Sequence, residues 1–451
     1  MRRNMIILLG ITLPLLVLLG CATVKTDEEW SQFKKTSRER TGHELLWEQS
    51  EGEEASIRKE ITEILADGLS RDEAVRIALL NNRILQSTFE EIGISKSDLV
   101  QAGLFRNPSI AALFRFPLDG GSTNIDAIGI FSLSDFWQIP FRKKVAAAQL
   151  EMSMMRVNQM VLDTAAEAKR AFDGLYFLRL GQKQTEEILT KFQEINDHVK
   201  TRRQFGFSSD LDIYFSQVMV VEAQLELYRI ERELSMSKAH LDRVLGLNTD
   251  LTDYRITQSQ NFHLHELPKM EAAWQQALSH RFDLQMARFK IAEAERKLAL
   301  EKVYVFREVN FLLSYERGIE REEVFGPGID IQLPIFDQNQ AQIAKAQHMV
   351  RRARKRLQAL EEQIKEEVIR DLERIDLHKT RAHLLEDQVI PLRQKALDYT
   401  SKWVNAMQLN RLFLLEAQKG LMRTQLDLLQ TQRELQLALV DLERHLGGKL
   451  P

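Results

Sequence analysis

Apolar residues recur every seven positions along two long stretches of the chain. In the first stretch they are Ile213, Val220, Leu227, Leu234 and Leu241, and in the second they are Leu414, Leu421, Leu428, Leu435 and Leu442. Three places after each stands a second member that is often small, such as Ala223 or Ala417. This heptad pattern is typical of helices that pack along other helices, and small residues allow a close approach. We therefore predict two long, laterally packed helices.

A two-residue alternation marks other regions and predicts strands. Apolar residues stand at Val309, Phe311, Leu313 and Tyr315, and again at Ile329, Ile331, Leu333 and Ile335, with polar residues such as Asp330 and Gln332 between them. These patterns predict strands over 308–316 and 328–335. Less regular alternation predicts strands over 109–117 and 124–134. A tilted strand needs about nine to eleven residues to cross a bilayer, so both pairs are membrane candidates.

The chain also repeats itself. ALLNNRIL at 78–85 is echoed by ALSHRFDL at 277–284, and LDRVLGL at 241–247 is echoed by LERHLGG at 442–448. We infer two copies of one unit, over 70–247 and 270–447, with a linker over 248–269 and a tail over 448–451. Each copy is predicted to run helix, strand, strand, very long helix, helix.

Capping and breaking residues place the predicted helices. Ser70 and Glu73 form a capping-box pattern, so a helix is expected from there to about Gly103, ahead of the Asn107–Pro108 break. After the second strand of each copy the pattern changes to helix, and the first long helix is expected over 141–204. At 1.5 Å per residue it would be roughly 95 Å long. In the second copy only Pro391 interrupts the long helix.

Composition agrees with long elements and excludes several function classes. The 451 residues include only 20 glycines and 9 prolines, so turns are few. The net charge of −3 leaves no basic surface for nucleic acid, and no nucleic-acid partner is expected. The sequence has no G-x-S-x-G, no glycine-rich phosphate loop and no H-E-x-x-H, so we expect neither an enzyme nor a cofactor.

The lone cysteine, Cys21, stands where an apolar run ends. Two arginines and the apolar residues Met5–Leu19 have the layout of an export signal, predicted over 1–20. One thiol excludes intrachain disulfides. The tetrapeptide ending at Cys21 resembles a bacterial lipobox, in which the cysteine is lipidated and becomes the new N-terminus, here of a segment over 21–69. Ala22, in place of aspartate, then favours the outer membrane. The alternative is an ordinary signal peptide with an incidental cysteine.

The strand count predicts an assembly. Four strands cannot close a barrel with an interior, and open edges in hydrocarbon leave backbone groups unpaired at a cost of several kcal/mol each. Other copies must supply the missing strands, and three copies of four strands would give twelve. The predicted fold class is therefore mainly α with a membrane β-barrel portion.

Taken together, several motifs resemble one family. The lipobox, the duplication, GPGIDIQLPIFDQNQAQIAKAQ, the FGFSSDLD turn and the two repeated endings are similar to the TolC family of outer-membrane efflux proteins, in its lipoprotein branch. The resemblance implies a homotrimer whose twelve-stranded barrel continues into a long α-helical barrel. It also implies an exit duct, in the outer membrane and extending into the periplasm, that docks with a periplasmic adaptor and an inner-membrane transporter.

The resemblance also directs attention to the turns that follow the long helices, as a periplasmic tip and gate. In the first copy these residues are Gly206, Asp210 and Asp212. Gly206 is expected to be left-handed, and Ser208, Ser209 or Asp210 is expected to cap the next helix. In the second copy, which lacks a glycine here, they are Asn405, Asn410 and Arg411. By position Asp212 and Asn410 match the family's gate. The alternative is that Asp210 and Asp212 only favour a helix N-terminus electrostatically.

Other interpretations were weighed. A coiled-coil lipoprotein scaffold without a channel would explain the heptads but not the bilayer-length strands. His263, His265 and Glu266 could ligate a metal, although two histidines one residue apart in a linker are more often incidental. The methionines at 152, 154, 155 and 160 have the spacing of helix packing rather than of a metal path. No metal site is predicted.

Overall fold

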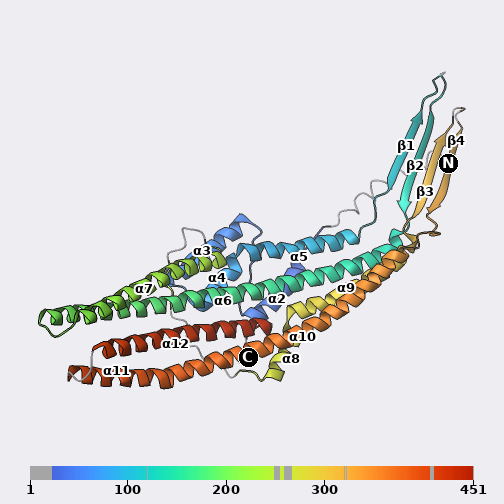
Figure 1. Ribbon diagram of the computed structural model, residues 1–451. Helices are drawn as coiled ribbons and strands as arrows, with labels where there is room; N and C mark the ends of the chain where they lie inside the picture. The colour runs from blue at the N-terminus through green and yellow to red at the C-terminus, as the bar shows by residue number, and fades with distance from the viewer. Residues whose placement is uncertain are drawn as a thin grey trace. The chain divides into compact units, whose positions relative to one another are not determined.

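The computed structural model describes residues 23–118, 120–247, 254–257, 267–318, 320, 322–406 and 411–449. The signal segment and Cys21 lie outside these residues. The described part forms two compact units (Figure 1). Unit 1 contains 23–33, 89–157 and 282–360, and unit 2 contains 34–88, 158–281 and 361–449, without the gaps just named.

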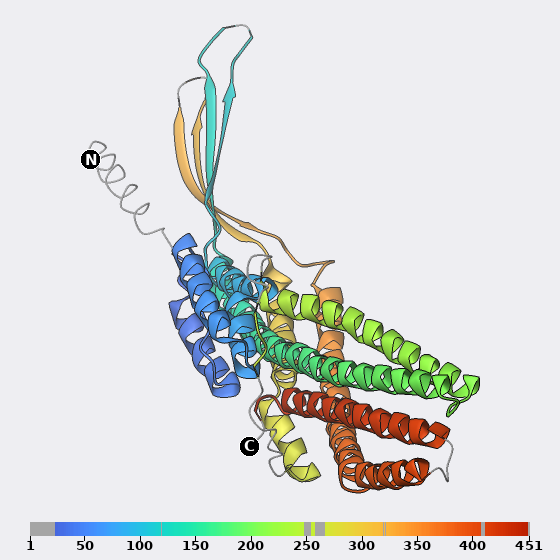
Figure 2. The same ribbon diagram turned by 90° about the vertical axis from the view of Figure 1, so that its left-hand side faces the viewer.

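Unit 1 holds one antiparallel sheet, in the order β1-β2-β3-β4 (Figure 2). Its strands are β1 (Ser109–Arg115), β2 (Asn124–Ser132), β3 (Val309–Arg317) and β4 (Glu323–Ile331). The central pairing joins β2 to β3, from Ser132 opposite Asn310 to Ile125 opposite Arg317. Each repeat thus contributes one hairpin, and the two hairpins form a single sheet.

Two strand predictions need correction. β1 ends at Arg115, two residues before Pro117, which has no N–H to donate. β4 was expected over 328–335, but it covers Glu323–Ile331, because it pairs residue for residue with β3 from Val309↔Ile331 to Arg317↔Glu323. The alternation therefore continues past the last paired residue. Pro327 lies within β4, at an edge of the described sheet, where proline is tolerated.

The sheet has one apolar face and one more polar face. Residues paired across strands lie on the same face, and this register joins Phe131 with Phe311 and Ile329, and Ala127 with Tyr315 and Phe325. The other face gathers Ser132, Asn310, Asp330, Asp126 and Glu316, among apolar residues such as Ile128 and Leu312. An Arg115–Asp126 ion pair of 2.7 Å lies on this polar face. The apolar face is exposed to a large extent, with Ile329 65% accessible.

The helix after Ser70 is split in two. The capping box is present, and α4 covers Arg71–Asn81, but α5 begins anew at Arg83–Ala102. Asn82 has an extended ψ of 114°. Its side-chain oxygen accepts from the Leu85 amide at 3.0 Å, and its side-chain amide donates to the Val244 carbonyl at 2.8 Å. The second repeat breaks likewise, between α8 (Met270–His280) and α9 (Phe282–Val303).

The long helices follow the predicted order. They are α6 (Asp135–Gln204), α7 (Asp210–Leu245), α10 (Gln340–Leu384), α11 (Ile390–Asn405) and α12 (Arg411–His445). The predicted interruption at Pro391 takes the form of a π-helical turn, η3 (Leu385–Val389), directly before α11. A short 3₁₀ turn, η2 (Tyr304–Phe306), precedes β3. Two N-terminal helices were not predicted, α2 (Asp27–Thr41) and α3 (Glu51–Asp67). Among the described helices none is long and apolar enough to span a bilayer.

The repeated motifs meet one another in unit 2. Gly246 ends α7 with φ +68°, and a Cβ there would lie 2.3 Å from the carbonyl oxygen of Asn81 at the end of α4. Gly447, after α12, has φ +80°, and its Cβ would lie 2.8 Å from the carbonyl group of His280 at the end of α8. Each repeat thus closes by backbone contact between its first and last helices, and the repeated motifs supply these contacts.

Two separate reasons can require glycine at a position: a left-handed backbone conformation, and a lack of space for a Cβ atom. Gly206 also has a positive φ, +78°, but nothing lies within 4 Å of its Cβ position. Gly206→Ala should therefore cost only about 1–2 kcal/mol, the penalty for a left-handed alanine. Gly246→Ala must in addition displace the backbone of Asn81. We therefore expect Gly246→Ala to lower the apparent unfolding temperature, measured by circular dichroism, more than Gly206→Ala does. Equal shifts for the two variants would contradict the close contact.

Candidate functional site at the ends of the helical hairpins

The turn between α6 and α7 is built as the sequence predicts. Gly206 is left-handed, and the Phe207 amide donates to the Arg202 carbonyl at 2.9 Å while the Gly206 amide donates to that of Arg203 at 3.0 Å. These bonds satisfy carbonyls at the end of α6. The space around Gly206 is open, so this position needs glycine for its backbone conformation alone.

Ser209 caps the following helix. The Asp212 amide donates to the Ser209 hydroxyl at 3.2 Å, and the Ser209 amide donates to the Asp212 carboxylate at 2.8 Å. This is a capping box, with aspartate in place of the more usual glutamate. Asp212, the residue matched to the family's gate, is therefore engaged in its own turn.

Asp210 forms the ionic contact of the turn. Arg203 donates to its two carboxylate oxygens at 2.7 and 3.2 Å, which is a bidentate geometry. The hydrogen bond from Arg203, reinforced by its charge, lowers the pKa of Asp210 below its ordinary value. The ion pair therefore stabilises the turn fully at a pH above the ordinary pKa of aspartate. This stabilisation is lost as the pH falls through the lowered pKa of Asp210. Both side chains are exposed, so the contribution is small and sensitive to salt.

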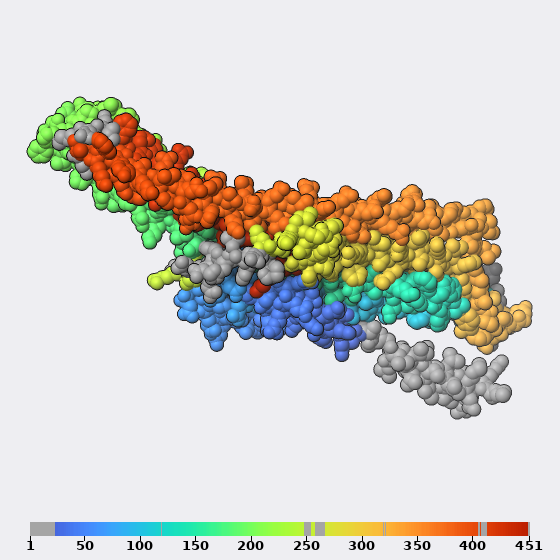
Figure 3. All heavy atoms as spheres, turned by 90° about the horizontal axis from the view of Figure 1, so that it is seen from below, coloured from blue at the N-terminus to red at the C-terminus, as the bar shows by residue number. Residues whose placement is uncertain are grey.

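The second turn connects α11 to α12 over 406–410. Asn405 is the last residue of α11 and Arg411 the first of α12, and only their backbones are described. Asn410 lies outside the described residues. The roles of these three residues in a gate stay predictions. Both hairpin ends lie at the same end of unit 2 (Figure 3).

A core holds the hairpins together near these turns. It contains two residues from each of α6, α7 and α12: Ile188 and Phe192, Met219 and Ala223, and Leu415 and Met422. The first residues of α7 and α12 consequently lie near one another. Since each is preceded by a helix that runs the other way, the two hairpins are aligned side by side.

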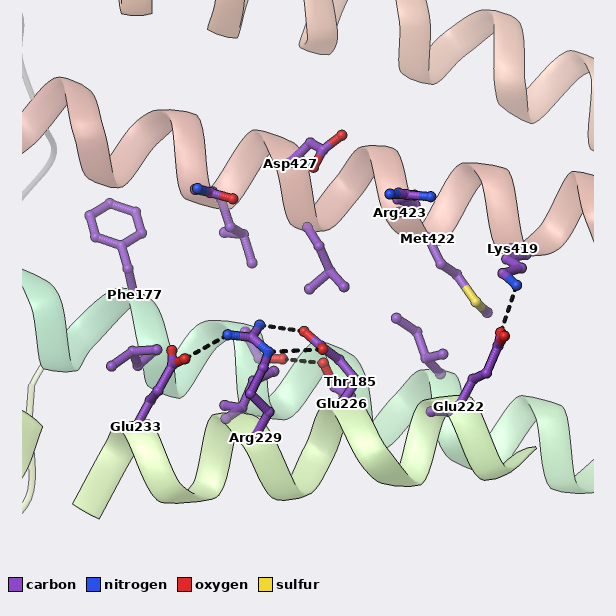
Figure 4. A pocket seen from close by; sticks show the side chains of 18 of the residues that line it. Phe177, Thr185, Glu222, Glu226, Arg229, Glu233, Lys419, Met422, Arg423 and Asp427 are labelled. Carbon is purple, nitrogen blue, oxygen red and sulfur yellow. Dashed lines mark hydrogen bonds and ion pairs between the residues drawn. The ribbon is translucent and has the colours of Figure 1, made fainter. Parts of the chain in front are cut away.

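A groove of about 510 Å³ opens beside this core, between α6, α7 and α12 (Figure 4). Phe177, Ile188, Phe192, Ala223, Ile230 and Met422 give it an apolar floor. Charged residues form its rim, where Lys419 contacts Glu222 at 2.6 Å and Arg229 contacts Glu233 at 2.7 Å and also Glu226. These two carboxylates raise the pKa of Arg229. Arg423 and Asp427 from α12 also line the groove.

The groove has the features of a binding surface. An apolar floor with a charged rim has the composition of a surface that holds another protein segment. Among the described residues no cluster of three or more His, Cys, Asp or Glu side chains could hold a metal ion. The linker histidines at 263 and 265 lie outside those residues.

Sequence reasoning missed the groove. A signal was present, because Glu222, Glu226, Arg229 and Glu233 follow one another at spacings of three or four residues, which puts them on one helix face. What the sequence did not show is which helix this face would meet.

Comparison with known proteins supports the resemblance. Residues 273–448 match the model of the outer membrane efflux protein family, over a stretch that nearly coincides with the second predicted repeat. No curated protein matches the chain by sequence.

Solved structures match both repeats. A structure of CusC, described for its conformational changes on folding and transmembrane channel formation, has a TM-score of 0.73 at 15% identity and covers 85% of this chain and 93% of its own. The outer-membrane channel OprN has a TM-score of 0.71 at 16% identity, covering 95% and 97%. The CmeC outer membrane channel of Campylobacter jejuni has a TM-score of 0.73 at 13% identity, covering 85% and 86%. The chain is thus similar in fold to outer-membrane channels, and its second repeat matches the outer membrane efflux protein family. This confirms the resemblance to outer-membrane efflux proteins found in the sequence, whereas the lipoprotein branch stays a prediction.

Proposed function

We propose that this chain is the outer-membrane exit duct of a tripartite efflux or type I secretion-like system. The observation that carries the proposal is the match of residues 273–448 to the outer membrane efflux protein family, together with a shared fold over both repeats. The duct is a passive conduit, since a water-filled channel needs polar walls and no reaction centre. The amphipathic sheet supports this function over a coiled-coil scaffold, which has no use for an exposed apolar sheet face.

The working form is a homotrimer. Three copies of the four-stranded sheet would supply twelve strands, so that the free edges of β1 and β4 find partners and the apolar face meets lipid. The hairpin ends then form one ring in the periplasm. There a periplasmic adaptor docks, next to the groove on α6, α7 and α12, and connects the duct to an inner-membrane transporter.

The ring is closed by ionic contacts at the turns. Asp210 and Arg203 form such a contact within one copy, and in a threefold ring each contact occurs three times. Arg411 directly follows the opposite turn, as the first residue of α12, and brings a further cation. Single substitutions at these positions therefore weaken the closed state of the duct, while the sheet and the helix packing stay intact.

The first test is conductance in planar bilayers. We expect Arg203→Ala and Asp210→Ala each to raise single-channel conductance, and added salt or a pH below the lowered pKa of Asp210 to do the same for the parent protein. The exchanged pair, Arg203→Asp with Asp210→Arg, is the matched control and should return towards the parent. Asp212→Ala and Arg411→Ala test the remaining gate predictions. Parent-like conductance in all four single variants would place the constriction elsewhere.

The second test concerns the anchor. We propose that Cys21 carries the lipid that attaches the mature N-terminus to the outer membrane. Cys21→Ala should therefore abolish labelling by a palmitate analogue and leave the export signal uncleaved at this site. Cys21→Ser serves as the near-isosteric control and should behave in the same way. Labelling that persists in either variant would exclude lipidation at Cys21.

A further inference from the structure

A small cavity lies between α9 and α10, which run side by side within unit 1 (Figure 1). Its volume is about 110 Å³. Its charged lining residues are Lys290, Glu293 and Lys297 from α9 and Arg352 and Arg356 from α10, and three alanines and a methionine also line it. Pockets for drug-sized ligands start at roughly 300 Å³. This cavity therefore suits one small chemical group rather than a whole large ligand.

The charges around this cavity are not balanced. The side chain of Glu293 is only 7% exposed, and its carboxylate pairs with the Lys290 ammonium group at 2.9 Å. Among the residues that the structure describes, none forms a hydrogen bond or an ion pair with the side chains of Lys297, Arg352 or Arg356. Three cationic side chains without a partner therefore meet at one small cavity.

The sequence of α10 explains why these cations lack partners. Residues 340–360 contain six lysines and arginines and no aspartate or glutamate. One of the arginines, Arg354, reaches Glu295 of α9 at 2.6 Å, but both residues lie about 200° around their helices from the cavity residues two positions away. Like charges that line one cavity repel, and an anion bound among them removes this repulsion.

A phosphate group fits this set of donors. The guanidinium groups of Arg352 and Arg356 present pairs of parallel N–H donors, which match phosphate oxygens, and Lys297 adds a compact positive charge. A carboxylate carries one negative charge, whereas a phosphate monoester carries nearly two at neutral pH. Three unpaired cations are therefore better matched by a phosphate group than by a carboxylate.

The position of the cavity along α10 separates a lipid phosphate from a phosphate in solution. At 1.5 Å per residue, Arg352 lies roughly 18 Å along the helix from its first residue, Gln340. In the proposed duct the bilayer surrounds the sheet, whose last strand ends before α10 begins. The headgroup region extends only about 5–8 Å beyond the hydrocarbon on each side. A lipid phosphate therefore does not reach the cavity, and the anion comes from solution.

The internal repeat indicates which face of the duct wall carries the cavity. The alignment of 78–85 with 277–284 places Glu295 of α9 at the position of Lys96 of α5. Helix α2 packs on that face of α5, where Glu29 pairs with Lys96. Because α2 follows the proposed lipid anchor in the chain, that face is the outer one. Lys297 stands two residues after Glu295, about 200° around α9, so the cavity lies on the inner face.

We propose that this cavity binds a phosphate-bearing anion from the lumen of the duct, through Lys297, Arg352 and Arg356. The proposal rests on the proposed function and adds to it a class of cargo, small soluble phosphate compounds. Three copies of the chain place three such cavities at one level of the wall. An anion bound there occupies part of the conduit, so it reduces the current that the duct carries.

Calorimetric titration of the full chain in mild detergent with pyrophosphate tests the site. The parent protein should bind pyrophosphate, with an affinity that falls as salt is added. Arg352→Gln with Arg356→Gln removes two of the three unpaired cations and should weaken binding by about tenfold or more. The matched control is Arg351→Gln with Lys355→Gln, which removes the same charge from exposed positions of α10 outside the cavity and should bind like the parent.

A further variant changes the affinity in the opposite direction. Glu293→Gln keeps the size of the side chain but removes the carboxylate that competes for the cations, so pyrophosphate should bind more tightly than to the parent. Absence of pyrophosphate binding by the folded parent, or an equal loss in the control pair, would overturn the site. Binding of phosphatidylglycerol in nanodiscs without any binding of pyrophosphate would overturn the soluble source of the anion.

Conductance in planar bilayers tests the assignment to the lumen. Pyrophosphate should reduce the single-channel conductance of the parent, and it should reduce that of Arg352→Gln with Arg356→Gln clearly less. Channels that bind pyrophosphate in the calorimeter but conduct equally with and without it would place the site outside the lumen and overturn the cargo class. A parent protein that binds pyrophosphate but forms no channel would instead contradict the proposed function itself.

Discussion

The lateral burial of long helices is the constraint on which the rest of this structure depends. A helix such as α6, with 70 residues, extends beyond any single compact core, so each stretch must be covered by another helix at that level. This requirement accounts for the heptad repeats, for the small residues between them and for the scarcity of glycine and proline. It also explains why an irregularity in helical phase matters. A shift in phase would turn every later apolar position of that helix away from its partner.

The closure of each repeat shows how the long helices are held at their far ends. Gly246 and Gly447 let the last helix of a repeat touch the backbone of the first, and Asn81 strengthens one of these contacts by donating to the carbonyls of Leu245 and Gly246. Backbone contact of this kind tolerates little sliding. The repeat therefore behaves as a closed unit, and the hairpin that extends from it is anchored at its base.

Sequence could predict those features whose causes are local. The strands around Phe311, the capping box at Ser70 and the left-handed Gly206 all depend on residues within a few positions of one another. The features that it missed depend on distant partners. The break at Asn82 is stabilised by the carbonyl of Val244, 162 residues away, and the bounds of β4 follow from the length of β3. The groove needed knowledge of which helix α7 would meet. At the candidate site the same distinction holds, because the contacts of Asp210 and Asp212 lie within one turn, whereas the second turn offers no such local signal.

The two turns at the hairpin ends are not equivalent, and this has a consequence for symmetry. A ring of three chains, each with two related repeats, approximates sixfold symmetry, and a sixfold ring of identical turns would narrow evenly. Here one turn has a left-handed glycine and a capped helix start at Ser209, while the other contains no glycine. In the proposed trimer, alternating turns around the axis would therefore differ in sequence and in flanking charge. Opening of such an aperture would be a threefold motion, in which one set of turns moves against the other.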